Sequence, residues 1–432
     1  MITPDCNAPA MLDESEPAAT LPAVTTLGSW LTCAPQDFDG DETFFARDTG
    51  LLSHGLVTCG VSSKAILIGA PRPNDAPDLL RVPLSDLVRA DWWREQGAEA
   101  VVLQTWSWRS LTPVAAAVRA AGCRLVLIQD SSGVTSPLVG WMDWVRQMWY
   151  FSRREKWPLP RFLLRFVHSH TIRLFRFERE RAAQFALADL LAVPSPPAVR
   201  RFRQLSRRFG GEAWERKVQL IPHPIASWFS WDGTPKENRV TAIGRWKDFP
   251  QKRPDILSAA LTEFLIAHPG WAADLFGTLD ESLQTWHAGL PADVARRVIL
   301  HGHVSSLELV AHLNRTKIVF CSSAYESFHI ASGEGLCSGA SVVGTDAGMT
   351  ASHRWFVSEE SGTLAEKLDA GLLAAALATE ADHWQQGHRD PSAISATWSA
   401  RLHAPQVAAE LIRQIANLPS ESPERAKGDS PG

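Results

Sequence analysis

The chain has 432 residues, more than the ~250–300 residues at which a single hydrophobic core stops growing, so two or three domains are expected. It is 45% hydrophobic and 21% charged, which is typical of globular proteins and excludes a fibrous or largely disordered chain. The formal net charge of −4 argues against nucleic acid as a partner, because a nucleic-acid-binding chain is usually basic.

Both ends of the chain are predicted to be disordered. Residues 1–24 are rich in Pro, Ala, Asp and Glu, and residues 419–432 are equally polar. The first segment lacks the basic start and apolar run of a secretory signal, and no run of about 18 apolar residues follows. The six cysteines are scattered without a C-x-x-C pair. We therefore expect a cytoplasmic protein in a reducing compartment, without a structural zinc site or a disulfide framework.

Predicted strands and helices alternate along the first half of the chain. Short apolar runs predict buried strands at Ala65–Gly69, Ala100–Leu103, Leu125–Ile128 and Val218–Pro222. Amphipathic stretches between them predict helices at Asp41–His54, Ala90–Gly97 and Leu111–Ala121. Buried strands that alternate with helices indicate a parallel, doubly wound sheet.

The pattern restarts after residues 230–237, a polar segment with Gly and Pro. The second series of strands is predicted at Val240–Gly244, Asp274–Gly277, Val298–Gly302, Ile318–Cys321 and Ser341–Thr345. Helices are predicted at Asp255–His268, Ser306–Arg315 and Gly333–Ser338. We therefore predict an α/β fold with two Rossmann-like domains facing each other, residues 25–229 and 238–418, with 230–237 as the linker.

Residues 141–185 depart from this pattern and are predicted to be a basic, aromatic helical insertion in the first domain. From Arg146 to Arg181 there are ten Arg or Lys residues against three Glu, a local charge of about +7, with Trp and Phe interleaved. Such a composition suits a helix that lies on an anionic membrane, here through residues 141–181. The alternative is an ordinary insertion with packed aromatic residues and solvated arginines.

The most informative stretch is 321–345, where a strand, a loop, a helix and a second strand follow one another. Glu326 lies in the loop, and Glu334 lies just inside the helix. The free N–H groups at the start of that helix are those of Phe328, His329, Ile330 and Ala331. A helix N-terminus is a ready anion site. A sugar diphosphate bound there could therefore donate hydrogen bonds from a hexose to Glu326 and from a ribose to Glu334.

Two cations follow the first strand of the second domain. That strand ends at Gly244, and Arg245 and Lys252 come directly after it. Ligands of open α/β sheets bind at the carboxyl ends of the strands. Fixed cations at this position would neutralise a departing diphosphate.

With these residues, the stretch 186–350 resembles the nucleotide-sugar domain of the retaining glycosyltransferases of family 4, which have the GT-B fold. The pair Glu326 and Glu334 matches the E-x7-E motif, Arg245 and Lys252 match the basic pair, and Gly302 precedes the helix 306–315 as in the family. The resemblance implies transfer of a hexose from a nucleotide diphosphate sugar without a metal or other cofactor. It places the acceptor, a glycan, glycolipid or lipid-linked sugar of cell-surface polysaccharide or glycolipid synthesis, on the first domain. If residues 141–181 lie on a membrane, the enzyme works at the cytoplasmic face of the inner membrane.

The sequence departs from the family pattern at three places. Four residues are interposed before Lys252 and no glycine follows it, so Lys247 or Arg253 could supply the second phosphate contact. The loop after the first strand has one glycine, Gly40, instead of a pair, and Asp130 stands where the family often has a histidine. The candidates for the acceptor side are Gly40, Asp41 and Asp130.

Other interpretations of these residues are weaker. Asp37, Asp39 and Asp41 have the D-x-D spacing of a metal site, but they directly follow a strand, and Asp41 is better read as the N-cap of the helix 41–54. A sugar-nucleotide epimerase of the same fold would need a catalytic carboxylate and histidine set that the sequence does not show. A non-catalytic nucleotide-sugar-binding scaffold is disfavoured by the complete set of two Glu, Arg and Lys.

Overall fold

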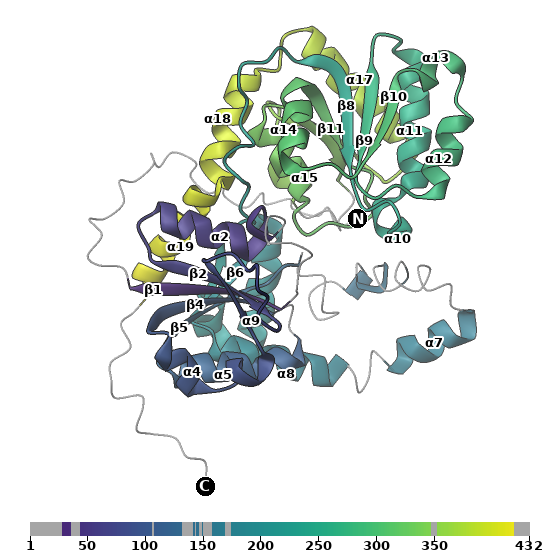
Figure 1. Ribbon diagram of the computed structural model, residues 1–432. Coiled ribbons are helices and arrows are strands. Elements are labelled where there is room, and N and C mark those ends of the chain that lie inside the picture. Colours follow the sequence, from purple (N-terminus) through teal and green to yellow (C-terminus); the bar gives the residue numbers. More distant parts are fainter. Residues whose placement is uncertain are drawn as a thin grey trace, which may run out of the picture.

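The computed structural model describes residues 28–35, 44–105, 108–131, 141–142, 144–146, 149, 158–168, 174–346 and 352–418. Figure 1 shows two α/β domains, each built on a sheet with helices on both faces. Both sheets are parallel, so the predicted pair of Rossmann-like domains is confirmed. The predicted leader 1–24 and tail 419–432 lie outside the described residues. No helix within the described ranges is long and apolar enough to cross a bilayer.

The first domain has a seven-stranded sheet in the order β3-β2-β1-β4-β5-β6-β7. Its strands are β1 Ser29–Ala34, β2 Ser63–Ile68, β3 Leu79–Val82, β4 Ala98–Gln104, β5 Arg124–Ile128, β6 Leu190–Val193 and β7 Val218–Leu220. Its helices are α2 Asp48–Thr58, α3 Leu84–Leu87, α4 Ala90–Glu95, α5 Thr112–Ala120, α7 Leu159–His168, α8 Leu174–Leu187 and α9 Pro196–Glu215, with a 3₁₀ turn at Arg109–Leu111.

The central strands of this sheet are apolar throughout because both of their faces are buried. In β4, Val101 and Leu103 belong to the core on one face, whereas Ala100 and Val102 belong to the core on the other. Side chains alternate between the two faces of a strand. A continuous apolar run is therefore the sequence signature of a strand covered by helices on both sides.

The second domain has a six-stranded sheet in the order β10-β9-β8-β11-β12-β13. Its strands are β8 Glu237–Ile243, β9 Ala272–Phe276, β10 Val298–Gly302, β11 Thr316–Phe320, β12 Ser341–Thr345 and β13 Gly362–Ala365. Its helices are α10 Phe249–Lys252, α11 Pro254–Ala267, α12 Glu281–Ala288, α13 Ala292–Ala295, α14 Ser306–Arg315, α15 Ile330–Cys337, α16 His353–Phe356, α17 Ala370–Gln385 and α18 Pro391–Leu402.

The last helix, α19 Ala404–Ala416, returns to the first domain. Figure 1 shows α18 and α19, in yellow, running from the second domain to the first. Leu411 of α19 shares a core with Leu52 and Leu56 of α2, and Arg124 of β5 donates a hydrogen bond of 2.6 Å to the carbonyl of Ile415. The predicted second domain, 238–418, includes α19, whose apolar face is buried against the first domain.

Two further predictions about the first domain need correction. The helix predicted at 41–54 corresponds to α2, which begins at Asp48 and has Arg47 as its N-cap; the predicted N-cap Asp41 lies outside the described residues. In the insertion 141–185, Arg181 is not a solvated cation. Its side chain is 1% exposed and pairs with Glu178 at 3.3 Å, because this half of α8 packs onto the domain through the buried Phe185.

Candidate active site

The candidate site lies where the strand order of the second sheet reverses. From β8 the chain proceeds to β9 and β10 on one side, then crosses back to β11, β12 and β13 on the other. β8 and β11 are parallel neighbours, with Val319 opposite Thr241. Loops that leave the carboxyl ends of two such strands diverge and expose a binding site between them. The loop after β8 carries Arg245 and Lys252, and the loop after β11 carries Glu326.

Lys252 and Glu326 form a buried ion pair at this point. The Lys252 Nζ lies 2.5 Å from the Glu326 Oε1, and the two side chains are 11% and 8% exposed. The backbone holds them together, since the Ala324 N–H donates to the Gln251 carbonyl at 2.7 Å. The Ser322 hydroxyl also donates to the Lys252 carbonyl at 2.8 Å. Two residues 74 positions apart in the sequence are thus fixed by the contact between α10 and the loop after β11.

Glu326 is ionised at neutral pH. Its burial favours the neutral acid, but the ammonium of Lys252 and the ring of His329 overcome this and lower the pKa of Glu326 to about 2. A carboxyl with such a pKa cannot serve as a general acid near neutrality. It can accept hydrogen bonds from hydroxyl groups and stabilise developing positive charge.

The other cations of this loop, Arg245, Lys247 and Arg253, are less buried than Lys252. Arg245 and Lys247 are exposed, and within the described part of the chain Arg245 forms no ion pair. Between them Trp246 is buried and donates to the Phe276 carbonyl at 2.9 Å, which anchors the loop to β9. Arg253 pairs with Asp255 at 2.6 Å. Of the three candidates for the second phosphate contact, Lys252 is the one that lies against Glu326.

Glycines allow the strand ends beside the site to approach one another. Gly277 has a φ of +99°, and a Cβ added to it would lie 2.1 Å from the Gly244 carbonyl oxygen. The Gly277 N–H donates to the Gly302 carbonyl at 2.7 Å. Gly244 and Gly302 therefore close the ends of β8 and β10 around Gly277, and only a residue without a side chain fits there.

Helix α15 begins at Ile330, within the predicted helix start at 328–331 and before the helical segment predicted at 333–338. Its N-terminus is directed toward the same edge of the sheet. The chain enters this helix through Phe328, His329, Ile330 and Ala331, and His329 is the N-cap. The Ser332 N–H donates to the His329 carbonyl at 3.0 Å. Gly335 lets α15 lie close to β11, because a Cβ there would meet Val319 Cγ2 at 2.3 Å. Glu334 is partly buried on this helix. Burial raises the pKa of Glu334 to about 7, against a smaller opposing effect of Arg47.

The first domain meets the site through Asp130, which follows β5. The Ser327 hydroxyl donates to the Asp130 Oδ1 at 3.1 Å, and the His223 Nε2 lies 2.9 Å from the same oxygen. His223 also packs edge-on against Phe328 at 5.3 Å between ring centroids. Asp130 thus lies at the junction of the two domains. Its hydrogen-bond partner Ser327 is the residue that follows Glu326 in the sequence.

Four residues considered in the sequence lie outside the described residues, and the contacts of Asp130 had no signal in the sequence. Gly40 and Asp41 lie outside the described residues, as do Asp37 and Asp39. The contacts of Ser327 and His223 with Asp130 join segments 197 and 93 positions apart, and no local motif could have indicated them. His223 lies in an Ile-Pro-His-Pro run, and nothing in that run indicates that its histidine contacts Asp130.

Comparison with known proteins agrees with this geometry. Residues 237–382 match the family described as glycosyl transferases group 1. The chain is similar to the crystal structure of HepE from Anabaena in complex with UDP, at 15% identity and a TM-score of 0.59, over 91% of this chain and 100% of that one. It is also similar to a sucrose-phosphate synthase from Thermosynechococcus elongatus, at 15% identity and a TM-score of 0.60, over 91% and 99% of the two chains.

A third similar structure is the apo form of the lipopolysaccharide outer core galactosyltransferase WaaB. It is 14% identical with a TM-score of 0.57, over 90% of this chain and 99% of that one. No curated protein matches the sequence. The two-domain arrangement is the GT-B fold that the resemblance implied.

Proposed function

The protein is a glycosyltransferase of the GT-B fold with a glycosyl transferases group 1 domain at residues 237–382, and we propose that it is a retaining, metal-independent hexosyltransferase of family 4. The donor would be a nucleotide diphosphate sugar held by the second domain. The observation that carries the proposal is the buried pair of Lys252 and Glu326 beside the N-terminus of α15, at the strand-order reversal of the sheet. The solved complexes of HepE with UDP and with UDP-glucose support a donor of this class.

The cations would act on the departing phosphate. The Lys252 ammonium has three N–H donors, so one can remain on Glu326 while others reach a phosphate oxygen. Arg245 is exposed at the end of β8 and could add a second contact. Together with the N–H groups at the start of α15, these charges would stabilise the diphosphate as it leaves, a role that other enzymes assign to a metal ion.

The carboxylates would act on the sugars. Glu326 is ionised, so it would accept hydrogen bonds from hexose hydroxyls and stabilise the positive charge that develops on the sugar ring. Glu334 would bind the ribose. Neither group needs to be a nucleophile, since the acceptor would attack on the face from which the phosphate leaves. Asp130 would meet the acceptor from the first domain.

The experiment is a panel of nucleotide sugars incubated with the protein, with released nucleotide and transferred sugar measured separately. One donor should be turned over, and NMR of the product should show the anomeric configuration of the donor. EDTA should leave turnover intact. Complete loss in EDTA with recovery by Mn²⁺ would contradict the metal-independent mechanism, and an inverted product would contradict retention. Nucleotide-sugar binding without any turnover would favour a scaffold.

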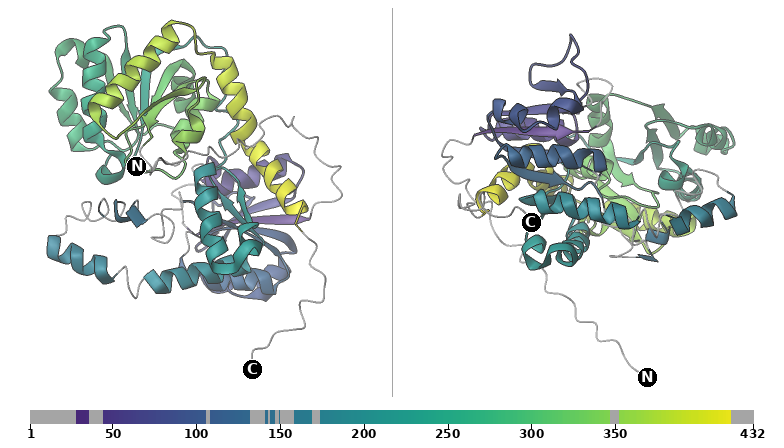
Figure 2. Two further views of the ribbon diagram at one scale, coloured as in Figure 1. Left: turned by 180° about the vertical axis from the view of Figure 1, so that it is seen from behind. Right: turned by 90° about the horizontal axis from the view of Figure 1, so that it is seen from below.

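We further propose a glycolipid or lipid-linked acceptor, because α7 suits a membrane surface. Figures 1 and 2 show α7 lying apart from both sheets. Its exposed apolar side chains are Leu159, Leu163, Leu164 and Val167, and Leu164 is 76% exposed. Arg161 is exposed on the same helix. An amphipathic basic helix gains free energy both by burying its apolar face in the headgroup region and by attraction to anionic lipid. The similar structure WaaB is a lipopolysaccharide outer core galactosyltransferase, which supports an acceptor of this kind.

This second proposal is tested by sedimentation with anionic vesicles. The protein should sediment with phosphatidylglycerol vesicles at low salt and be partly released at high salt, because salt screens the electrostatic attraction. The double change Leu163→Glu and Leu164→Glu should abolish sedimentation. Leu307→Glu is the matched control, since Leu307 is 71% exposed on α14, and it should sediment like the parent. If the parent does not bind anionic vesicles, α7 is an ordinary surface helix and a soluble acceptor is the better proposal.

A further inference from the structure

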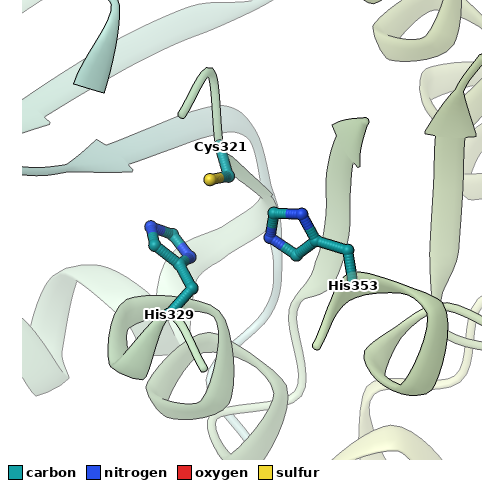
Figure 3. A group of neighbouring side chains, drawn as sticks. All are labelled: Cys321, His329 and His353. Atoms are coloured by element: carbon teal, nitrogen blue, oxygen red, sulfur yellow. The ribbon is translucent and has the colours of Figure 1, made fainter. Parts of the chain in front are cut away.

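A cluster of three potential metal ligands lies beside the candidate active site. Figure 3 shows Cys321, His329 and His353 directed toward a common space. Cys321 follows β11, His329 precedes α15, and His353 begins α16. All three side chains are buried. The Cys321 Sγ and one ring nitrogen of each histidine lie within 4.8 Å of one another.

The orientation of His329 is already that of a metal ligand. Its Nδ1 lies 2.7 Å from the Ser332 hydroxyl, so its Nε2 is left for the Cys321 side. A metal-binding histidine commonly holds its other nitrogen on such a polar partner. The backbone of His329 has a φ of +64°, a costly conformation for a residue with a side chain.

His353 is the unexplained member of the cluster. It is 0% exposed, and neither ring nitrogen has a hydrogen-bond partner of normal geometry, although the backbone of Thr345 lies near the ring. Gly344 provides its space, because a Cβ there would lie 3.0 Å from the ring. A buried polar group without a partner costs free energy, and an ion is one of the few things that can satisfy it.

We propose that Cys321, His329 and His353 bind one Zn²⁺ ion, with water in a fourth position. Thiolate and imidazole are the ligands that zinc prefers, at about 2.3 Å for sulfur and about 2.0 Å for nitrogen. Ligand atoms around a tetrahedral zinc are separated by roughly 3.3–3.8 Å, so shifts on the order of 1 Å close the cluster on the ion. Of the charged groups that face it, Lys252 and Glu326 neutralise each other, and the thiolate supplies the net negative charge.

A second cluster of potential metal ligands lacks a free carboxylate and is not proposed as a zinc site. Asp274, His301 and His312 also lie within 4.8 Å of one another. The Asp274 carboxylate is already engaged, because Arg239 and His301 each lie 2.7 Å from one of its oxygens. This site is therefore an ion-pair network, and it serves as an internal control.

The proposal does not rest on the proposed reaction, and cobalt tests it without an activity assay. Purified full-length protein is stripped with chelator and titrated with Co²⁺. One equivalent should bind with a thiolate-to-cobalt charge-transfer band in the near ultraviolet, and Zn²⁺ should displace it. Zn²⁺ should also raise the Tm, because an ion that binds only the folded state stabilises it.

Matched variants locate the site. Cys321→Ser should lose the charge-transfer band, and His353→Ala should weaken cobalt binding by at least ~10-fold. Cys337→Ser and His312→Ala should behave like the parent, since Cys337 is equally buried and His312 belongs to the other cluster. No band in the parent, or an unchanged band in Cys321→Ser, overturns the proposal. If the variants do not fold, X-ray absorption of zinc-loaded parent protein decides, because one sulfur and two imidazole nitrogens are required.

Discussion

Lys252 and Glu326 form a buried ion pair, and the free energy of unfolding should fall when only one of the two charges is removed. Removing one partner of a buried ion pair leaves the other charge uncompensated, at a cost of about 3–5 kcal/mol. We therefore expect Lys252→Met and Glu326→Gln each to lower stability, and the double variant to recover most of the loss. Urea unfolding measures this. If the double variant is as unstable as the worse single variant, the two charges are not coupled in the folded state.

The same variants should separate stability from catalysis. Each of them, including the stable double variant, should reduce kcat by roughly 10²-fold or more, because the lost contacts act on charge that develops in the transition state. Glu334→Ala should instead raise the donor KM, since a contact with the ribose is equal in the ground state and the transition state. Steady-state kinetics with the identified donor provides the measurement. Parent kinetics in the Glu326 and Glu334 variants would move the site elsewhere.

The pH dependence of stability should reveal the burial of Glu334. Its pKa is about 7 in the folded protein against an ordinary value of 4.5. The folded state therefore binds the proton more tightly, and stability decreases as the pH rises from about 4.5 to about 7. Glu334→Gln removes this penalty, so it should raise the Tm at pH 8 and have little effect at pH 4.5.

Glu308→Gln is a control of opposite sign for that experiment. Hydrogen bonds from the Ser305 backbone and hydroxyl lower the pKa of Glu308. A lowered pKa stabilises the folded state above the ordinary value, and this contribution is lost as the pH falls. Glu308→Gln should therefore lower the Tm at pH 8 and approach the parent in acid. Equal pH profiles for both variants would exclude the assignment for Glu334.

At the scale of elements, the junction between α10 and α11 separates Lys252 from Arg253, two candidates for the second phosphate contact. Arg253 joins the two helices with a φ of +50°. A left-handed residue other than glycine costs roughly 1–2 kcal/mol, whereas its surface ion pair with Asp255 contributes about 0.2–1 kcal/mol. Arg253→Gly should thus leave the Tm unchanged or slightly higher. Donor turnover should stay near the parent value, and a tenfold loss of kcat would assign the phosphate contact to Arg253.

The elements that the sequence predicts best are those with two local signals. The strands at Val298–Gly302 and Ser341–Thr345 combine an apolar run with a glycine turn nearby. The helix Ser306–Arg315 combines amphipathic spacing with a capping box between Ser305 and Glu308. The four-residue strand Gly362–Ala365 escaped prediction, because its pairing with β12, and not its own composition, makes it a strand.

In the candidate site, too, local motifs could be predicted from the sequence, whereas contacts between separate loops could not. The E-x7-E spacing and the cations after β8 could be predicted, because each lies within one loop and its neighbouring helix. The contact of Lys252 with Glu326, the hydrogen bond of Ser327 to Asp130 and the cluster around His353 could not. They depend on how separate loops meet at the edge of the sheet, which no single segment of sequence encodes.

At the scale of the whole molecule, α19 should stabilise the first domain and not the one that precedes it in sequence. Leu411 is buried against α2, so Leu411→Ala should cost about 2–5 kcal/mol. Hydrogen exchange should increase in α2 and β1 and remain unchanged in β11 and β12. Leu377→Ala is the matched control, because Leu377 is equally buried within the second core, and it should show the reverse pattern.

The return of α19 has a consequence for how the chain can be divided. The outgoing and returning segments run side by side, since the Ile225 N–H donates to the Leu402 carbonyl at 2.7 Å and the Ala404 N–H donates to the Ile225 carbonyl at 3.0 Å. In covalent terms, the second domain is therefore a guest inserted into a host domain. The guest is one continuous piece, about 237–402, and its core also includes Leu51, Ile225 and Phe229 of the host. The host needs both flanking pieces, so a gene cut at the linker separates α19 from the domain whose core it completes.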